Sequence, residues 1–115
     1  MNFNEYQAFA KTTDVFTENA AQKVNDPCFI TKILGLSGEA GEVAEKFKKI
    51  LRDKDGIVSE EDKTEIVKEL GDVLWYVAII SHYLGVDFND VAQKNVEKLT
   101  SRQNRNVIHG QGDNR

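Results

Sequence analysis

The sequence has one proline, one cysteine and no long apolar run in its 115 residues. Cys28 has no second cysteine with which to form an internal disulfide, which is typical of proteins from a reducing cytoplasm. The lack of a long apolar run argues against a membrane span, and the first residues show no signal-peptide pattern. We therefore expect a cytoplasmic protein with no membrane partner.

Positive charge is also scarce. The chain has 15 lysines and arginines against 19 aspartates and glutamates, so its formal net charge is −4, and its isoelectric point is near 5.2. A surface that binds duplex nucleic acid needs clustered cations to displace counterions from the phosphates. A nucleic-acid polymer is therefore not an expected partner, and any connection to nucleic acids is expected to run through nucleotide monomers.

Helical periodicity runs through most of the sequence and is interrupted by residues that typically begin or end helices. An imperfect apolar stripe predicts a first helix over about residues 4–22. Asp26 followed by Pro27 is typical of an N-cap and the first helical residue, and predicts a second helix that continues to about Arg52.

The third predicted helix carries the strongest periodic signal. Ser59, with Asp62 three residues later, can cap its start, and Gly85 can end it. Its apolar stripe alternates steps of four and three residues: Ile66, Leu70, Val73, Val77, Ile80 and Leu84. Asp87 can then cap a fourth helix.

These elements predict an all-α fold, because no segment alternates polar and apolar residues with a period of two. The length suits one domain, and we expect a four-helix bundle over residues 1–105. Residues 106–115 are polar and irregular, and they are predicted to form a short, flexible C-terminal tail.

Two pairs of acidic residues stand three residues apart on the second and third predicted helices. Glu39 and Glu42 form the first pair and Glu69 and Asp72 the second, so each pair lies on one face of its helix. A glycine directly precedes the second acid of each pair, where a missing side chain lets another helix or a ligand approach closely. If the two helices are antiparallel, the pairs converge and repel unless a cation lies among them. Such hard oxygen ligands suit Mg²⁺, with Mn²⁺ as a substitute.

The same acids also admit a purely structural interpretation. Glutamates three or four residues apart are common on solvated helix faces, where Glu42 could pair with Lys46 and Glu45 with Lys49. On that interpretation the chain is a non-catalytic helical oligomerisation module with a charged surface.

A row of polar and cationic residues follows one side of the fourth predicted helix. Asn95, Lys98, Arg102 and Arg105 stand at steps of three, four and three. Lysine and arginine bind phosphate through charge-assisted hydrogen bonds, so this row could hold an anionic ligand beside the metals. Alternatively, these cations only complement the negative end of the helix dipole.

Aromatic and amide side chains provide candidates for contact with a nucleobase. Gln7 and Tyr76 are the most polar of them, and Trp75 could add a stacking surface. Aromatic residues at helical spacing are also typical of a hydrophobic core, so both roles stay open. His82 and His109 lack the Glu-x-x-His spacing of a ferritin-like di-iron site.

The order of these motifs carries a resemblance to a known family. Glu39-x-x-Glu42 precedes Glu69-x-x-Asp72 in "KELGDVLWYV", and "NVEKLTSR" follows. Over about residues 4–105 the sequence resembles the MazG-like branch of the all-α nucleoside triphosphate pyrophosphohydrolases. The resemblance implies Mg²⁺-dependent hydrolysis of (d)NTPs to the monophosphate and pyrophosphate, with these four acids as metal ligands.

Further roles follow from the resemblance. It implies phosphate contacts from Lys98 and Arg102, and we expect Glu39 or Glu42 to orient or deprotonate the attacking water. Deoxynucleotides are the favoured substrates, for nucleotide-pool control or house-cleaning, with dUTP or a phosphoribosyl nucleotide as the alternative. Family members form dimers or pairs of dimers, so we expect a homotetramer, with a homodimer as second choice. We expect the tail to fold over the site of its own or an adjacent subunit.

Overall fold

The computed structural model describes residues 1–16 and 23–115, and this part of the chain contains four α-helices and no strand. The helices are α1 (Phe3–Thr12), α2 (Pro27–Asp53), α3 (Glu60–Tyr83) and α4 (Phe88–Asn104). The predicted all-α class is confirmed. None of these described helices combines the length and apolar character needed to cross a membrane.

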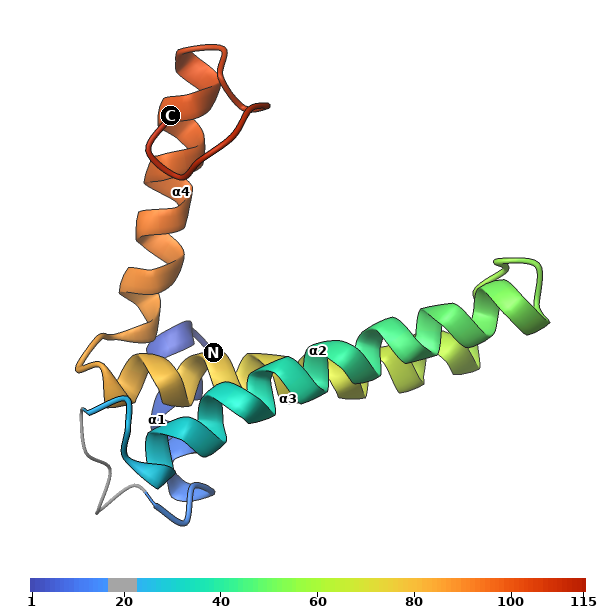
Figure 1. Cartoon of the computed structure of the whole chain (residues 1–115), viewed down its shortest axis with the longest axis horizontal. Coiled ribbons are helices and arrows are strands. Elements are labelled where there is room, and N and C mark those ends of the chain that lie inside the picture. The colour runs from blue at the N-terminus through green and yellow to red at the C-terminus, as the bar shows by residue number, and fades with distance from the viewer. Residues whose placement is uncertain (17–22) are drawn as a thin grey trace.

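The two longest helices form an antiparallel hairpin, and the other two gather at its open end. Figure 1 shows α2 and α3 side by side along the hairpin, with α1 packed across its base. The fourth helix leaves this base at a steep angle and extends away from the hairpin (Figure 1). The acidic pairs of α2 and α3 therefore lie on an arm that α4 does not cover.

Local sequence explains most helix ends. Asp26 caps α2 by accepting a hydrogen bond from the amide of Cys28 at 2.9 Å, and Ser59 forms the predicted capping box with Asp62 at the start of α3. Gly85, just beyond α3, adopts a φ of 71°, in the left-handed region that favours glycine. Asp87 lies at the predicted N-cap of α4, but its side chain makes no capping hydrogen bond.

The first helix is shorter than the prediction. It ends at Thr12 because the next residues turn inward, where the carboxylate of Asp14 is fully buried against the ammonium of Lys32 at 2.8 Å. At its start Asn2 and Glu5 form a capping box that the sequence analysis did not identify. Residues 17–22 of the predicted helix lie outside the described residues.

The core lies where α1 meets the beginning of α2, the end of α3 and the beginning of α4. Its buried residues are Ala10, Phe29, Ala78, Ile79, Tyr83 and Phe88. The stripe predicted on α3 is only partly buried, since Ile66 is buried whereas Leu70 and Leu84 are 50% and 57% exposed. Along the hairpin arm α3 packs mainly against α2, so that only its α2-facing side is covered (Figure 1).

The C-terminal segment folds back onto the last turns of its own α4. Arg115 donates hydrogen bonds to the backbone carbonyls of Val107, Ile108 and Gly112, at 3.3, 2.8 and 2.5 Å. Arg102 donates to the carbonyl of Asp113 at 2.5 Å. The tail therefore lies on α4, away from the hairpin, and does not cover the acidic residues of its own chain (Figure 1).

Candidate functional site

The antiparallel register of α2 and α3 brings acidic residues from both helices together. Carboxylate oxygens of Glu39, Glu69 and Asp72 all lie within 4.8 Å of one another. We call these three residues the carboxylate cluster. Glu39 and Glu69 are partly buried and Asp72 is exposed, so the cluster has both a protein side and a solvent side. Three of the four predicted ligands thus converge within a single chain.

The fourth predicted ligand, Glu42, lies outside the carboxylate cluster. It is exposed, one helical turn beyond Glu39 on α2. The alternative in which Glu42 pairs with Lys46 does not describe this structure, because the ammonium of Lys46 lies 3.5 Å from the carboxylate of Glu69. The pairing of Glu45 with Lys49 is observed, with the carboxylate and the ammonium 3.9 Å apart. Glu45 makes a shorter contact of 2.8 Å with Lys48.

Electrostatics make the carboxylate cluster favourable for a cation. Burial raises the pKa of Glu39, and the negative charges of Asp72, Glu69 and Glu42 raise it further. A positive ion among these groups would reduce their repulsion. The donor set consists of carboxylate oxygens, contains no sulfur or imidazole, and is open to water on one side, which fits a hard divalent cation such as Mg²⁺.

A pocket of about 360 Å³ opens beside the carboxylate cluster. It is lined by Thr13, Glu39, Asp72, Trp75 and Tyr76. The rings of Trp75 and Tyr76 meet edge to face, with centroids 4.9 Å apart, and the indole N–H of Trp75 donates to the hydroxyl of Thr13 at 2.8 Å. Apolar rings next to converging carboxylates suit a ligand that has a flat ring at one end and an anionic, metal-bound group at the other.

The position of Tyr76 in this pocket depends on Gly35. A Cβ atom on Gly35 would lie 2.2 Å from ring carbon Cε1 of Tyr76, so only glycine admits the ring here. Gly41 and Gly71, for which the sequence analysis predicted close approach, have no atom of the described residues within 4 Å of such a Cβ, apart from their own local backbone. Gly41 and Gly71 are exposed, whereas Gly35 is partly buried against the ring of Tyr76 from α3.

Gln7 has a structural role that differs from its predicted one. It is buried, and its side-chain amide donates to the carbonyls of Ala78 and Val86, both at 3.1 Å. Its carbonyl accepts a hydrogen bond from the amide of Phe88 at 3.2 Å. With these groups used to join α1 to the α3–α4 connection, Gln7 is not available to read a base edge, which corrects the prediction.

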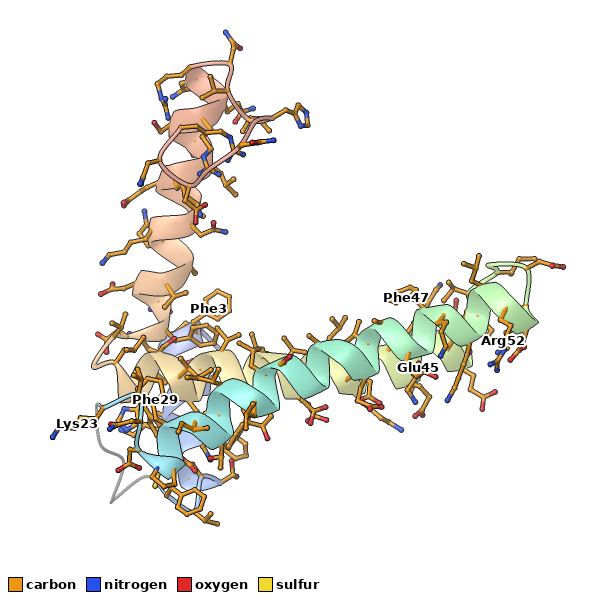
Figure 2. The ribbon with its side chains drawn as sticks, in the orientation of Figure 1. Phe3, Lys23, Phe29, Glu45, Phe47 and Arg52 are labelled. Atoms are coloured by element: carbon orange, nitrogen blue, oxygen red, sulfur yellow. The ribbon has the colours of Figure 1, made fainter. Side chains whose placement is uncertain are left out.

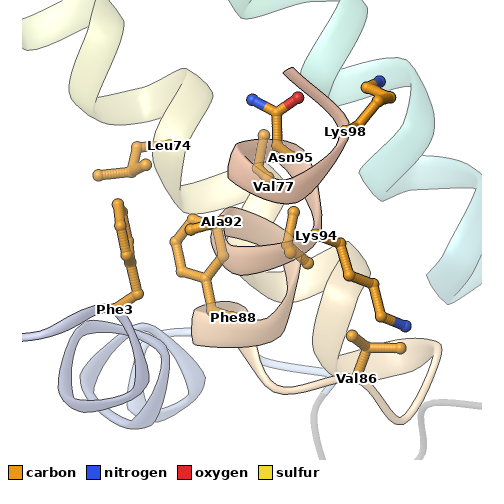
Figure 3. A pocket seen from close by; sticks show the side chains of 10 residues that line it. Phe3, Leu74, Val77, Val86, Phe88, Ala92, Lys94, Asn95 and Lys98 are labelled. Carbon is orange, nitrogen blue, oxygen red and sulfur yellow. The ribbon is translucent and has the colours of Figure 1, made fainter. Parts of the chain in front are cut away.

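The polar row on α4 lies apart from the carboxylate cluster of the same chain. Asn95 and Lys98 line a groove of about 640 Å³ between α3 and α4, where Leu74 and Val77 form part of the wall (Figure 3). Lys98 and Arg102 each lie 3.3 Å from the carboxylate of Asp113 in the tail. These cations therefore contact the tail rather than the acids of the hairpin.

A buried charged pair near the pocket was missed by the sequence analysis. Lys32 of α2 lies 2.8 Å from Asp14, and their side chains are 8% and 0% exposed. The hydroxyl of Tyr83 also donates to Asp14. Burial raises the pKa of Asp14, but hydrogen bonds from Lys32 and Tyr83 outweigh it and hold the pKa below its usual value. The only signal in the sequence is a lone lysine near Phe29 on a partly apolar face, which is a weak one.

Comparison with known proteins identifies the family. Residues 29–107 match the MazG nucleotide pyrophosphohydrolase domain. The chain belongs to the MazG family. Its MazG domain contains the carboxylate cluster, both pocket aromatics and the row on α4, whereas Gln7, Thr13 and Asp14 precede the matched region.

Two relatives extend the comparison. The Gene 37 protein of Mycobacterium phage L5 is 44% identical over 116 residues, covering 100% of both chains. The uncharacterized protein YvdC of Bacillus subtilis (strain 168) is 43% identical over 42 residues, which cover 36% of this chain and 40% of the relative. No solved structure matches the chain. Membership in the family supports a nucleotide pyrophosphohydrolase as the general function.

Proposed function

We propose that this MazG domain is a Mg²⁺-dependent nucleoside triphosphate pyrophosphohydrolase that converts (d)NTPs, preferentially dNTPs, to the monophosphate and pyrophosphate. The observation that carries the proposal is the carboxylate cluster, whose oxygens lie within 4.8 Å of one another beside an aromatic pocket. Such an enzyme would serve nucleotide-pool control or house-cleaning. Mn²⁺ is the expected substitute metal, because it also prefers oxygen ligands.

Each residue of the site has a role in this proposal. Glu39, Glu69 and Asp72 would hold the metal, which when bound supplies charge neutralisation on the phosphate and activation of water. Glu42, exposed one turn from Glu39, completes the acidic set from the solvent side. Either Glu39 or Glu42 orients the attacking water and accepts its proton.

The base and the outer phosphates would be bound by different elements. Trp75 and Tyr76 line the pocket next to two cluster carboxylates, which supports stacking of the base there. Lys98 and Arg102, together with Asn95, would contact the outer phosphates. Since α4 does not bring them to the carboxylates of its own chain, we propose that a neighbouring subunit supplies them.

The proposed chemistry makes a definite prediction about the position of attack. With the outer phosphates held away from the carboxylates, the α-phosphate is attacked and pyrophosphate leaves. In ¹⁸O-labelled water with Mg²⁺, the label should appear in the nucleoside monophosphate and be absent from pyrophosphate, as measured by mass spectrometry. Label in pyrophosphate, or orthophosphate as the primary product, would contradict this mechanism.

The same assay should use all eight common NTPs and dNTPs, dUTP and one phosphoribosyl nucleotide. A preference for canonical dNTPs supports the main proposal, whereas exclusive use of dUTP or the phosphoribosyl compound supports the alternative substrates. No turnover of any of them with Mg²⁺ or Mn²⁺ would favour a non-catalytic module.

The apolar surface of the hairpin predicts self-association. Five large apolar side chains on α2 and α3 are about half exposed or more in the single chain: Leu34, Phe47, Leu51, Val67 and Leu70. Burying such a surface between copies is favourable, so we expect a homotetramer built as a dimer of dimers, with a homodimer as second choice. Light scattering during size-exclusion chromatography measures the mass directly, and a monomer at micromolar concentration would refute both states.

One disruptive variant and one control variant test whether the exposed side of α3 forms the interface. Leu70→Glu places a charge on the exposed side of α3, so it should reduce the assembly to a smaller species without unfolding the chain. Val24→Glu, which changes another exposed apolar residue outside the hairpin helices, should leave the mass unchanged.

A further inference from the structure

Lys32 is a buried lysine that lies beside an acid and two aromatic rings. Its ammonium is 2.8 Å from Asp14, 5.0 Å from the ring centroid of Phe16 and 5.2 Å from that of Trp75. Burial of a lysine is costly unless its charge is paired, and attraction to an aromatic face adds stabilisation. The ion pair and the two rings therefore hold the positive charge of Lys32 at one position beside Trp75, which lines the pocket.

Asp14 holds this charge in position because it is itself anchored from several sides. Its carboxylate accepts a hydrogen bond from the hydroxyl of Tyr83 on α3 and another from the amide of Phe16 at 3.2 Å. With the Lys32 contact from α2, the carboxylate links three parts of the chain that are distant in sequence. The ammonium therefore has a defined location relative to α3.

Trp75 connects this buried pair to the pocket. Its ring lies beside the Lys32 ammonium. The same ring lines the pocket together with Glu39 and Asp72. Its indole N–H is directed to Thr13, the residue that directly precedes Asp14. Both contacts of the ring thus depend on the short segment that Asp14 anchors.

We propose that Lys32, paired with Asp14, is a positioning residue that holds the indole of Trp75 as the base-stacking wall of the pocket beside the carboxylate cluster. The inference rests on the proposed function, because it takes the base of a nucleotide as the ligand of Trp75. Lys32 acts through the ring and does not touch the nucleotide. It therefore determines how tightly the base is held rather than how fast the phosphate is attacked.

The single tryptophan of the chain makes this testable in the full-length protein. In Lys32→Met, quenching of Trp75 fluorescence by acrylamide should increase, because the ring loses the charge that holds it. The KM of the best dNTP should rise, by at most about fivefold to tenfold, because the Lys32–Trp75 contact sets the upper limit of what holding the ring in place contributes to binding of the base. The value of kcat should stay within about twofold, since no group that contacts the reacting phosphate is changed.

Three further variants separate positioning from a merely structural role. Lys32→Arg keeps a cation near the rings and should restore most of the wild-type KM and quenching. Tyr83→Phe removes another hydrogen bond of Asp14 but leaves Lys32, so it should lower stability without changing quenching or KM. Asp14→Asn combined with Lys32→Met removes both buried charges together, and should fold and repeat the KM effect if Lys32→Met alone does not fold.

Wild-type quenching and KM in both Lys32→Met and the double variant would overturn the inference. So would equal changes of KM in Tyr83→Phe and Lys32→Met, because these would report only lost stability. Failure of the proposed function is recognised separately, as absence of nucleotide turnover in the wild-type protein. In that case unchanged quenching in the Lys32 variants would also overturn the positioning of Trp75, and increased quenching would support it.

Discussion

Replacing Asp72 by asparagine is expected to reduce Mg²⁺-dependent pyrophosphate release by about a hundredfold or more, because a metal ligand contributes several kcal/mol to the transition state and each 1.4 kcal/mol is about tenfold in rate. Asp72 is exposed, and asparagine keeps its shape, so the helices should stay intact. Glu39→Gln and Glu69→Gln should have similar effects, since their carboxylates belong to the same cluster. A continuous pyrophosphate assay with far-ultraviolet circular dichroism measures both properties.

A matched control lies on the same helix as Glu39. Glu45 forms an ion pair with Lys48 at 2.8 Å and is not part of the carboxylate cluster, so Glu45→Gln should retain wild-type turnover. Mg²⁺ should raise the melting temperature of the wild type and of Glu45→Gln but not that of Asp72→Asn, because only a metal bound to the folded state stabilises it. Wild-type activity in both Glu42→Ala and Asp72→Asn would contradict the assignment of the site.

Replacing Asp14 by alanine is expected to lower the free energy of unfolding by about 3–5 kcal/mol, the usual cost of leaving a buried charge without its partner. The ammonium of Lys32 would lose its ion-pair partner at a side chain that is only 8% exposed, and the Tyr83 hydroxyl would lose its acceptor. Small domains have a total stability of only about 5–15 kcal/mol, so this variant should be marginal. Urea denaturation followed by circular dichroism gives the difference.

The pH dependence of stability should change in the same variant. The pKa of Asp14 is lower in the folded chain than in the unfolded chain, so the folded state binds fewer protons there. Its contribution is therefore complete above the unfolded pKa of about 3.9 and is lost as the pH falls through the folded pKa. The wild type should lose this stability in acid, and Asp14→Ala should show a shallower loss. Equal stabilities of the two proteins at pH 7 would contradict the role of the pair.

Much of the secondary structure could be predicted because its causes are local. Asp26 and Ser59 cap helices through hydrogen bonds to residues two or three positions away, and Gly85 ends α3 through its own backbone conformation. The spacing of the acids is equally local, since residues three apart lie on one face of any α-helix. The all-α class and the position of acidic pairs on two neighbouring helices therefore follow from short stretches of sequence alone.

Which of these residues contact one another depends on how the helices pack. The register of the hairpin places Glu39 opposite Glu69 and Asp72 and leaves Glu42 outside, and it makes Gly35 the glycine that admits Tyr76. The fourth helix extends away from the hairpin (Figure 1), and its cations Lys98 and Arg102 contact Asp113 of the tail instead of the carboxylate cluster. Such outcomes depend on how whole helices pack, which no short pattern encodes.

The roles of the buried polar residues are the least predictable from short sequence patterns. Gln7 bonds to backbone groups more than 70 positions away, and Asp14 meets Lys32 and Tyr83 from two other helices. Figure 2 shows the side chains of the helices crowded together at the base of the hairpin, around Phe29. A glutamine, a lysine or an aspartate is ordinarily a surface residue, and only a partner brought to it by packing makes its burial favourable. The partner, and with it the role of the residue, was therefore decided by the fold.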